Sequence, residues 1–413
     1  MNYFIKNIHI NKLFHLENID IPIANGKYPH LIITGKNGSG KTVLLNAIAE
    51  FLSNIKDDRG LSFLSWEKQL RVYRMNSLTA TVMADKAAYQ NVMASISSQI
   101  DRVFGKVDVK FGDVSRVVNK YVDGDFIIAM YRAYRKPEMV EPKNPTKPRY
   151  SKKGDVKETA TNQFLNFMSD MKIQEALARN EKQFDDADEI NAWFVDFEKL
   201  LQRIYQDENL KLEFNYKDYS FRICTESKRF KFTELSDGFA AVLDIVADLI
   251  LKMQDDGSLT RVYEKEGIVL IDEIETHLHL ELQKIIMPLL TRIFPNIQFI
   301  VTTHSPFVLN SMPDAVAYDL EHRKPIEDLS NYSYEALAEG YFGVSTESSA
   351  VEMRLNRLQE LLEQEERTDA EKNEIKILIT ELDKVSEAVS PDLVGEYVSL
   401  KLNHVNIIKE IGI

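Results

Sequence analysis

The pattern of apolar and polar positions predicts a chain that opens with strands and then alternates strands with helices. Residues 3–10 and 17–23 alternate between apolar and polar side chains, as two strands joined by a polar turn do. Short apolar runs typical of buried strands lie at HLIITG (30–35), DFIIAMYRAY (125–134), GIVLIDE (267–273), IQFIVTTHS (297–305) and DAVAYDL (314–320), which we expect to be the last strand. This order favours an α/β fold with a mixed sheet.

Helical patterns occupy most of the remaining chain. We expect helices at 41–52, 162–184, 189–206 and 278–294, a mostly helical region over 53–122, and three strands at 210–216, 219–225 and 229–235. Near the end, Ile375, Leu378, Leu382, Val385 and Val389 follow a 3-4-3-4 spacing that predicts a helical hairpin. A capping box of Thr368 and Glu371 begins its second helix, and Pro391 is expected to close it.

These elements predict four regions. An N-terminal half over 1–135 and a second half over 211–325 are separated by a middle segment at 136–210 and followed by a helical extension at 326–413.

Composition narrows the class of protein. The chain has 413 residues, a formal net charge of −13 and a single cysteine, Cys224, which excludes an intramolecular disulfide and a cysteine-rich zinc site. No segment resembles a signal peptide or an apolar membrane helix, so we expect a cytoplasmic protein without a membrane partner.

The strongest chemical signal is a glycine-rich loop between a buried strand and a helix. The residues GKNGSGKT fit the pattern G-x-x-x-x-G-K-[ST], and the flanking elements are those that a phosphate-binding loop requires. Successive backbone N–H groups and a helix N-terminus would hold the phosphates of a nucleotide. The side chains of Lys41 and Thr42 are suited to the β- and γ-phosphates and to Mg²⁺. The predicted nucleotide-binding residues are Gly35, Lys36, Asn37, Gly38, Ser39, Gly40, Lys41 and Thr42.

Two more strand ends carry reactive side chains. Asp272 is suited to hold Mg²⁺ beside Thr42, and Glu273 to act as general base on the attacking water. His304 follows the next buried strand, and in an open parallel sheet these strand ends share one edge. We therefore predict that His304 reaches the γ-phosphate. Alternatives remain for each residue, namely solvated carboxylates at an ordinary strand end and a structural histidine.

His277 and His279 raise the question of a metal site. Their i, i+2 spacing does not place both on one helical face, and further ligands are not evident nearby, so this interpretation is disfavoured.

The order of these motifs resembles one known family. A phosphate loop, a long insertion, LSDGF, LIDE and TTHS follow each other as in the ABC-type ATPase head, and the run IDEIETHLHLELQ is similar to the branch of SMC, RecF and OLD ATPases. The resemblance covers roughly residues 1–320. It implies an ABC-type head with a short helical insertion, and a glutamine loop after DFIIAMYRAY.

The resemblance also implies why the chain carries a second glycine-serine loop. LSDGF would be the signature loop, in which Ser236 and the Gly238 backbone complete the nucleotide site of a second copy, head to tail. Asp237 and Phe239 depart from the usual Leu-Ser-Gly-Gly-Gln, and a carboxylate at Asp237 is electrostatically unfavourable near a phosphate.

A compact head with no nuclease motif of its own resembles the stand-alone ATPase subunits of anti-phage systems of the PARIS and Septu type. That resemblance implies an oligomeric sensor that controls a separately encoded effector, a nuclease. The alternatives are a RecF-like DNA repair ATPase and a non-hydrolysing, ATP-gated scaffold.

One segment has an unusual charge. Residues 132–157 contain nine Lys or Arg, three acidic residues and four prolines, which predicts an exposed, extended loop. The loop could contact DNA phosphates or an acidic partner, or it could be a solvated loop without a partner.

Overall fold

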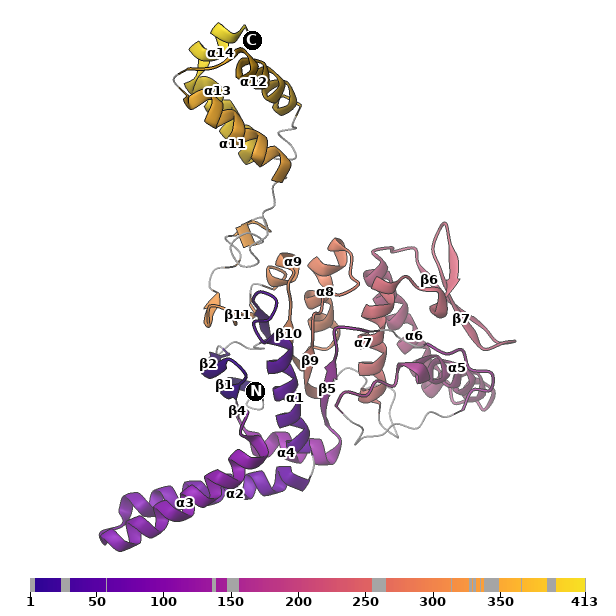
Figure 1. Ribbon diagram of the computed structural model, residues 1–413. Coiled ribbons are helices and arrows are strands. Elements are labelled where there is room, and N and C mark those ends of the chain that lie inside the picture. Colours follow the sequence, from indigo (N-terminus) through magenta and orange to yellow (C-terminus); the bar gives the residue numbers. More distant parts are fainter. Residues whose placement is uncertain are drawn as a thin grey trace. The chain divides into compact units, whose positions relative to one another are not determined.

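The computed structural model describes residues 4–23, 30–56, 58–135, 139–146, 156–254, 265–312, 314–326, 329, 332–334, 336–337, 349–364, 366–384 and 391–412 (Figure 1). The chain divides into two compact units, Met1–Tyr334 and Glu335–Ile413. The nucleotide-binding motifs all lie in the first unit, and no helix among the described residues is long and apolar enough to cross a membrane.

A six-stranded sheet forms the centre of the first unit, in the order β12-β11-β3-β10-β9-β5. Its strands are β3 (Leu31–Thr34), β5 (Phe126–Tyr131), β9 (Glu266–Ile271), β10 (Ile297–Thr302), β11 (Val316–Asp319) and β12 (Lys324–Ile326). Every pair is parallel except the edge pair β11–β12. The fully buried runs in β3, β5 and β10 are what a parallel sheet covered on both faces requires. The α/β class predicted from the sequence is thereby confirmed.

A second, antiparallel sheet packs onto the first through helix α1 (Lys41–Lys56). It has the order β2-β1-β4, from β1 (Ile5–Leu13), β2 (Leu16–Pro22) and β4 (Val107–Phe111). Buried side chains of this sheet, of α1 and of β3, β9 and β10 form one apolar cluster. The core therefore fixes the start of α1 relative to the ends of the central strands.

The region 53–122 is mostly helical, as predicted from the sequence, but it contains one strand that was not predicted. Helices α2 (Asp58–Thr79) and α3 (Met83–Phe104) form a long hairpin that extends away from the sheets (Figure 1), but β4 then returns to pair with β1. Helix α4 (Val114–Asp123) follows and ends at the left-handed Gly124. The prediction was wrong for β4 because its partner lies about a hundred positions away in the sequence.

The middle segment forms a lobe with an aromatic core. Helices α5 (Phe164–Asn180) and α6 (Phe184–Tyr205) pack together, and the predicted strands β6 (Lys211–Asn215), β7 (Ser220–Cys224) and β8 (Arg229–Lys231) form an antiparallel sheet. Trp193 stacks on Phe197 with centroids 5.3 Å apart. Helix α7 (Asp237–Met253) follows this lobe, and α8 (Leu280–Ile293) and the short α9 (Pro306–Leu309) follow the next two strands.

One prediction for this unit is wrong, and another holds only in part. β11 is not the last strand, because β12 pairs with it through the turn after Asp319. The basic segment 132–157 is not simply an exposed loop, since Arg135, Met139 and Val156 are buried. Positions 136–138 and 147–155, with Lys136, Lys147, Arg149, Lys152 and Lys153, lie outside the described residues.

The second unit contains four described helices, α11 (Ser349–Glu363), α12 (Asp369–Leu382), α13 (Pro391–Asn403) and α14 (Val405–Ile411). The Thr368–Glu371 capping box is present, and Ile375, Leu378 and Leu382 are buried as predicted. Pro391 does not end the bundle but begins α13, a position where its missing N–H costs no hydrogen bond. Val385 and Val389 lie outside the described residues.

Candidate nucleotide-binding site

The loop between β3 and α1 has the backbone of a phosphate cradle. Gly35, Gly38 and Gly40 adopt φ values of 135°, 83° and 98°, which side chains other than glycine rarely reach. A Cβ at Gly40 would lie 2.8 Å from Leu16 Cδ1, so packing also requires glycine there. Lys36 forms an ion pair with Glu321, and Ser39 lies buried inside the loop.

The side chain of Lys41 folds back onto the glycine-rich loop at residues 35–40. Its Nζ donates to the carbonyls of Gly35 at 2.8 Å and Lys36 at 3.0 Å. Burial lowers the pKa of Lys41, and the nearby carboxylates of Glu273 and Glu275 oppose this shift. The ammonium group is therefore fixed within the loop by bonds that phosphate oxygens could replace.

The end of β9 brings a carboxylate to the start of α1. Thr42 Oγ1 donates to Asp272 Oδ1 at 3.2 Å, and Thr302 Oγ1 donates to the same oxygen at 2.7 Å. A hydroxyl and a carboxylate are hard oxygen ligands that suit Mg²⁺. The two residues predicted for the metal from the sequence are thus adjacent, and they fit that ion.

Glu273 follows in a strained backbone conformation. Its φ is 44°, its amide donates to Thr302 Oγ1 at 2.8 Å, and Thr276 Oγ1 donates to its Oε2 at 3.3 Å. Such a conformation persists only where neighbouring contacts impose it, and it directs the carboxylate toward the phosphate loop.

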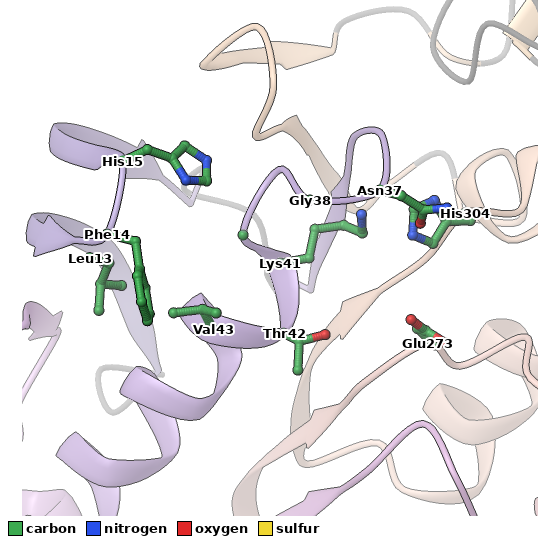
Figure 2. Close-up of a pocket in the computed structure, with 11 residues that line it drawn as sticks. Leu13, Phe14, His15, Asn37, Gly38, Lys41, Thr42, Val43, Glu273 and His304 are labelled. Atoms are coloured by element: carbon green, nitrogen blue, oxygen red, sulfur yellow. The ribbon is translucent and has the colours of Figure 1, made fainter.

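A cavity of about 370 Å³ is lined by most of the predicted residues, although Gly35, Lys36, Ser39 and Asp272 do not line it. Asn37, Gly38, Gly40, Lys41, Thr42, Glu273 and His304 line it, and Figure 2 shows Lys41, Thr42, Glu273 and His304 around the same space. They gather because β3, β9 and β10 are parallel neighbours whose carboxyl ends meet at one edge.

His304 lies on a loop held by Glu275, a residue that the sequence analysis missed. The His304 amide donates to Glu275 Oε1 at 2.5 Å, and Thr303 Oγ1 donates to Oε2 at 2.8 Å. Burial raises the pKa of Glu275, whereas burial and then Lys41 lower the pKa of His304. A neutral imidazole can donate a hydrogen bond to a phosphate oxygen. Within the acidic run DEIETH, the sequence alone did not separate Glu275 from Glu273.

Arg135 is a second residue that the sequence analysis missed. Its Nη1 donates to the Asp272 carbonyl at 3.1 Å, and its Nη2 to the carbonyls of Glu273 and Ile274 at 3.2 and 3.1 Å. One guanidinium therefore clamps the whole turn that carries the predicted metal ligand and general base. It stands where the resemblance placed a glutamine loop, and described positions 132–135 contain no glutamine.

The β1–β2 turn supplies the other wall of the cavity. Leu13, Phe14 and His15 line it, and the Phe14 ring is 80% exposed at a left-handed position. An exposed aromatic ring beside a phosphate loop offers a stacking surface for a nucleobase. Nothing in the strand pattern of 3–23 marked this residue.

Ser236 and Gly238 are not among the residues that line this cavity. Ser236 is exposed at the N-cap of α7, and its side chain makes no capping hydrogen bond. Gly238 is buried, and a Cβ there would lie 2.9 Å from the His277 carbonyl oxygen, so packing explains this glycine. Phe239, the unusual residue of the loop, stacks on Tyr205 with centroids 4.0 Å apart.

The two histidines of the HLH run have separate environments. His279 is the N-cap of α8, where its Nδ1 accepts from the Leu282 amide at 3.4 Å. His277 is exposed, with φ of 70°, and its ring lies near that of Tyr134.

Comparisons with known proteins give consistent matches. Residues 95–310 match the family described as "AAA domain, putative AbiEii toxin, Type IV TA system". The Septu protein PtuA of Bacillus mycoides (strain KBAB4) is 24% identical over 403 residues, which is 92% of this chain and 50% of that protein. The Retron Ec83 probable ATPase of Escherichia coli is 44% identical over 81 residues, 19% of this chain and 15% of that protein.

The chain thus spans half the length of the first of these relatives and a smaller share of the second. Among solved structures, an SMC head bound to the C-terminal winged-helix domain of ScpA covers 78% of this chain and 97% of its own, at 13% identity and a TM-score of 0.38. The resemblance to Septu-type ATPases inferred from motifs is confirmed by the PtuA match.

Proposed function

The chain belongs to the family described as "AAA domain, putative AbiEii toxin, Type IV TA system", and from that premise we propose that it binds and hydrolyses ATP with Mg²⁺. The observation that supports this most is the cavity in which Lys41, Thr42, Glu273 and His304 converge. Mg²⁺ held by Thr42 and Asp272 would supply charge neutralisation at the β- and γ-phosphates.

The side chains divide the work by position. Lys41 exchanges its two carbonyl partners for phosphate oxygens, and the N–H groups from Gly35 to Thr42 hold the remaining ones. Glu273 accepts the proton of the attacking water, and His304 donates to the γ-phosphate. Glu275 keeps the His304 loop in place through its bonds to the amide of His304 and the hydroxyl of Thr303.

Two substitutions test this assignment. Lys41→Ala should weaken ATP binding at least tenfold, because the loop loses its cation. Glu273→Gln should keep ATP binding and lower kcat by about 10²-fold or more, because an amide cannot accept the proton. Binding by calorimetry and turnover by phosphate release measure both.

Glu281→Gln is a matched control, since Glu281 lies on α8 in an exposed ion pair with Lys284. It should leave both binding and turnover unchanged. Hydrolysis by Glu273→Gln at the wild-type rate would show that another group is the base.

We infer further that a second copy completes each site. Ser236 is exposed, its hydroxyl makes no capping bond, and it begins a helix of 17 residues whose N-terminus attracts anions. Ser236 and the Gly238 backbone would thus contact the γ-phosphate held by the partner copy, giving a head-to-tail dimer or a larger homo-oligomer.

The biological role that we propose is control of a separately encoded effector, a nuclease, in cytoplasmic anti-phage defence. The matches to a Septu PtuA and to a retron ATPase support it. Expression of this gene together with its neighbouring gene should reduce phage plating, and Lys41→Ala should abolish the protection. Protection by this chain alone would contradict a separate effector.

One observation favours a second candidate, a non-hydrolysing, ATP-gated scaffold. Asp237 is exposed directly after Ser236, and a carboxylate near the γ-phosphate of the partner site would oppose the charge that develops during hydrolysis. Phosphate release from wild-type protein decides between the two candidates. A RecF-like repair ATPase would instead show ATP-dependent DNA binding.

A further inference from the structure

A second cavity, of about 460 Å³, is lined in part by Arg135, the residue that binds the carbonyls of the turn at 272–274. The end of β5, residues 157–162 and helix α7 form it, and it shares no lining residue with the nucleotide cavity. Its volume is in the range of small-molecule sites. No role that we have assigned to the ATP site uses it.

The charged groups of this cavity are mostly cationic. Arg132, Arg135 and Lys157 line it against one acid, Asp244. Thr161 Oγ1 donates to Asp244 Oδ1 at 2.6 Å, and burial raises the pKa of this carboxyl group. Asp244 thus already has a hydrogen-bond partner, and three cationic side chains against one carboxyl group leave the cavity with a net positive charge.

Two of the three cationic side chains, those of Lys157 and Arg135, are held in place before any ligand arrives. Lys157 Nζ donates to Asn46 Oδ1 of α1 at 2.7 Å, and both terminal nitrogens of Arg135 bind backbone carbonyls. Arg135 is only 7% exposed, and its remaining donor, Nε–H, has no partner among the described residues. A buried donor without an acceptor costs on the order of 1–3 kcal/mol.

We propose that this cavity binds a phosphate group of a small ligand, a nucleotide or a free polyphosphate, and that Arg135 transmits its presence to the ATPase site. Fixed cations together with the hydroxyl of Thr159 and the amide of Asn162 match the several oxygens of a phosphate. The cavity is named the Arg135 cavity below.

Transmission follows from the contacts of Arg135. The same guanidinium binds the carbonyls of Asp272, Glu273 and Ile274. A ligand that shifts the guanidinium of Arg135 therefore also shifts Glu273, the proposed general base, without contacting the nucleotide. Binding in this cavity should change kcat for ATP more than the affinity for ATP.

The test is a calorimetric titration of inorganic pyrophosphate into protein saturated with Mg·ADP, which fills the phosphate loop first. We expect one saturable site per chain. Arg132→Gln and Lys157→Gln should each weaken this binding at least tenfold. Lys143→Gln, an exposed cation of the same segment that does not line the cavity, is the matched control and should have no effect.

A parallel titration with AMP distinguishes the two sources of the phosphate. Tighter binding of AMP than of pyrophosphate indicates a nucleotide, and the reverse order indicates a free polyphosphate. Either order supports the cavity, provided that Arg132→Gln and Lys157→Gln weaken the binding.

Three results would overturn the proposal. They are no saturable binding of either probe, binding that neither substitution weakens, and binding of duplex DNA alone with the same dependence on Arg132 and Lys157. The last result would assign the cavity to nucleic acid. Because the assay needs no hydrolysis, its outcome is separate from that of the proposed ATPase activity, and the probes can also be titrated without ADP.

Discussion

At the scale of single residues, Arg135 explains how the turn at residues 272–274 keeps its shape. Glu273 has a left-handed backbone, which costs on the order of 1–3 kcal/mol for a residue with a side chain. Three consecutive carbonyls of this turn point to one guanidinium, which offers a planar set of donors that a lysine cannot reproduce. Arg135 is therefore a positioning residue for Glu273.

We predict that Arg135→Ala lowers kcat about tenfold or more while KM for ATP changes little, because the base is displaced and the phosphate loop is not. Guanidinium ion, added far below denaturing concentrations, should restore part of the activity by entering the vacated space. Steady-state kinetics with and without the ion measure this.

Glu273→Gln serves as the control for that rescue, since guanidinium cannot replace a carboxylate. A contrary result is that guanidinium fails to reverse the loss of kcat in Arg135→Ala while the variant also unfolds at a lower temperature than wild type. That result would show that Arg135 has only a structural role.

The residues that sequence reasoning found and those it missed differ in one physical respect. Lys41, Asp272 and His304 lie in recognisable local patterns that follow β3, β9 and β10, and parallel pairing of these strands then brings them together. Arg135 and Glu275 act through contacts to backbone groups of other loops, which no spacing in the sequence records. Arg135 even belonged to a segment whose charge predicted exposure.

At the scale of elements, a buried histidine forms a hydrogen bond between two neighbouring segments of the central sheet. His30 precedes β3, and its Nδ1 accepts from the Phe299 amide of β10 at 3.1 Å. Burial lowers the pKa of His30 to about 4 from its usual value near 6.5. The link between β3 and β10 therefore requires a neutral imidazole.

This shift predicts an acid-sensitive fold. As the pH falls from about 6.5 to about 4, the unfolded chain binds a proton at His30 and the folded chain does not. Folding should therefore lose on the order of 3 kcal/mol from this group alone, and the loss is absent above pH 7. Urea unfolding at several pH values measures it.

His30→Asn keeps an acceptor for the Phe299 amide but does not titrate. It should lose less stability than wild type over this pH range, because it lacks the titrating imidazole of His30. The carboxyl groups common to both proteins contribute equally and cancel in the comparison. Parallel stability curves for the two proteins would show that His30 does not cause the acid sensitivity.

The limits of sequence reasoning differ among elements. Fully apolar strands and helices with clear periodicity were predicted well, because burial on both faces or on one stripe determines them. β4 and β12 were not, since a short edge strand owes its form to its partner strand, which for β4 is the distant β1 and for β12 the neighbouring β11. Pro391 was taken as an end although proline also suits the first turn of a helix.

At the scale of the whole molecule, the first unit carries two loops for which we propose a phosphate-binding role, and they do not line the same cavity. The loop from Gly35 to Thr42 and the turn at residues 272–274 line one cavity, whereas Ser236 is exposed outside it. Phe239 stacks on Tyr205 of α6, so the start of α7 packs against the middle lobe. A site that needs both loops therefore needs two copies of the chain.

Complementation between two inactive variants tests this arrangement. Ser236→Arg and Lys41→Ala should each abolish turnover alone, because every site then lacks one of its parts. In a mixed head-to-tail dimer, one site contains the intact Lys41 of one copy and the intact Ser236 of the other. An equal mixture should recover up to roughly a quarter of wild-type activity, since about half of the dimers are mixed and each has one intact site.

Mixing Ser236→Arg with the double variant Ser236→Arg/Lys41→Ala is the control, because no pairing restores a complete site there. If mixed oligomers form and the first mixture stays as inactive as the control, the site is built from one chain.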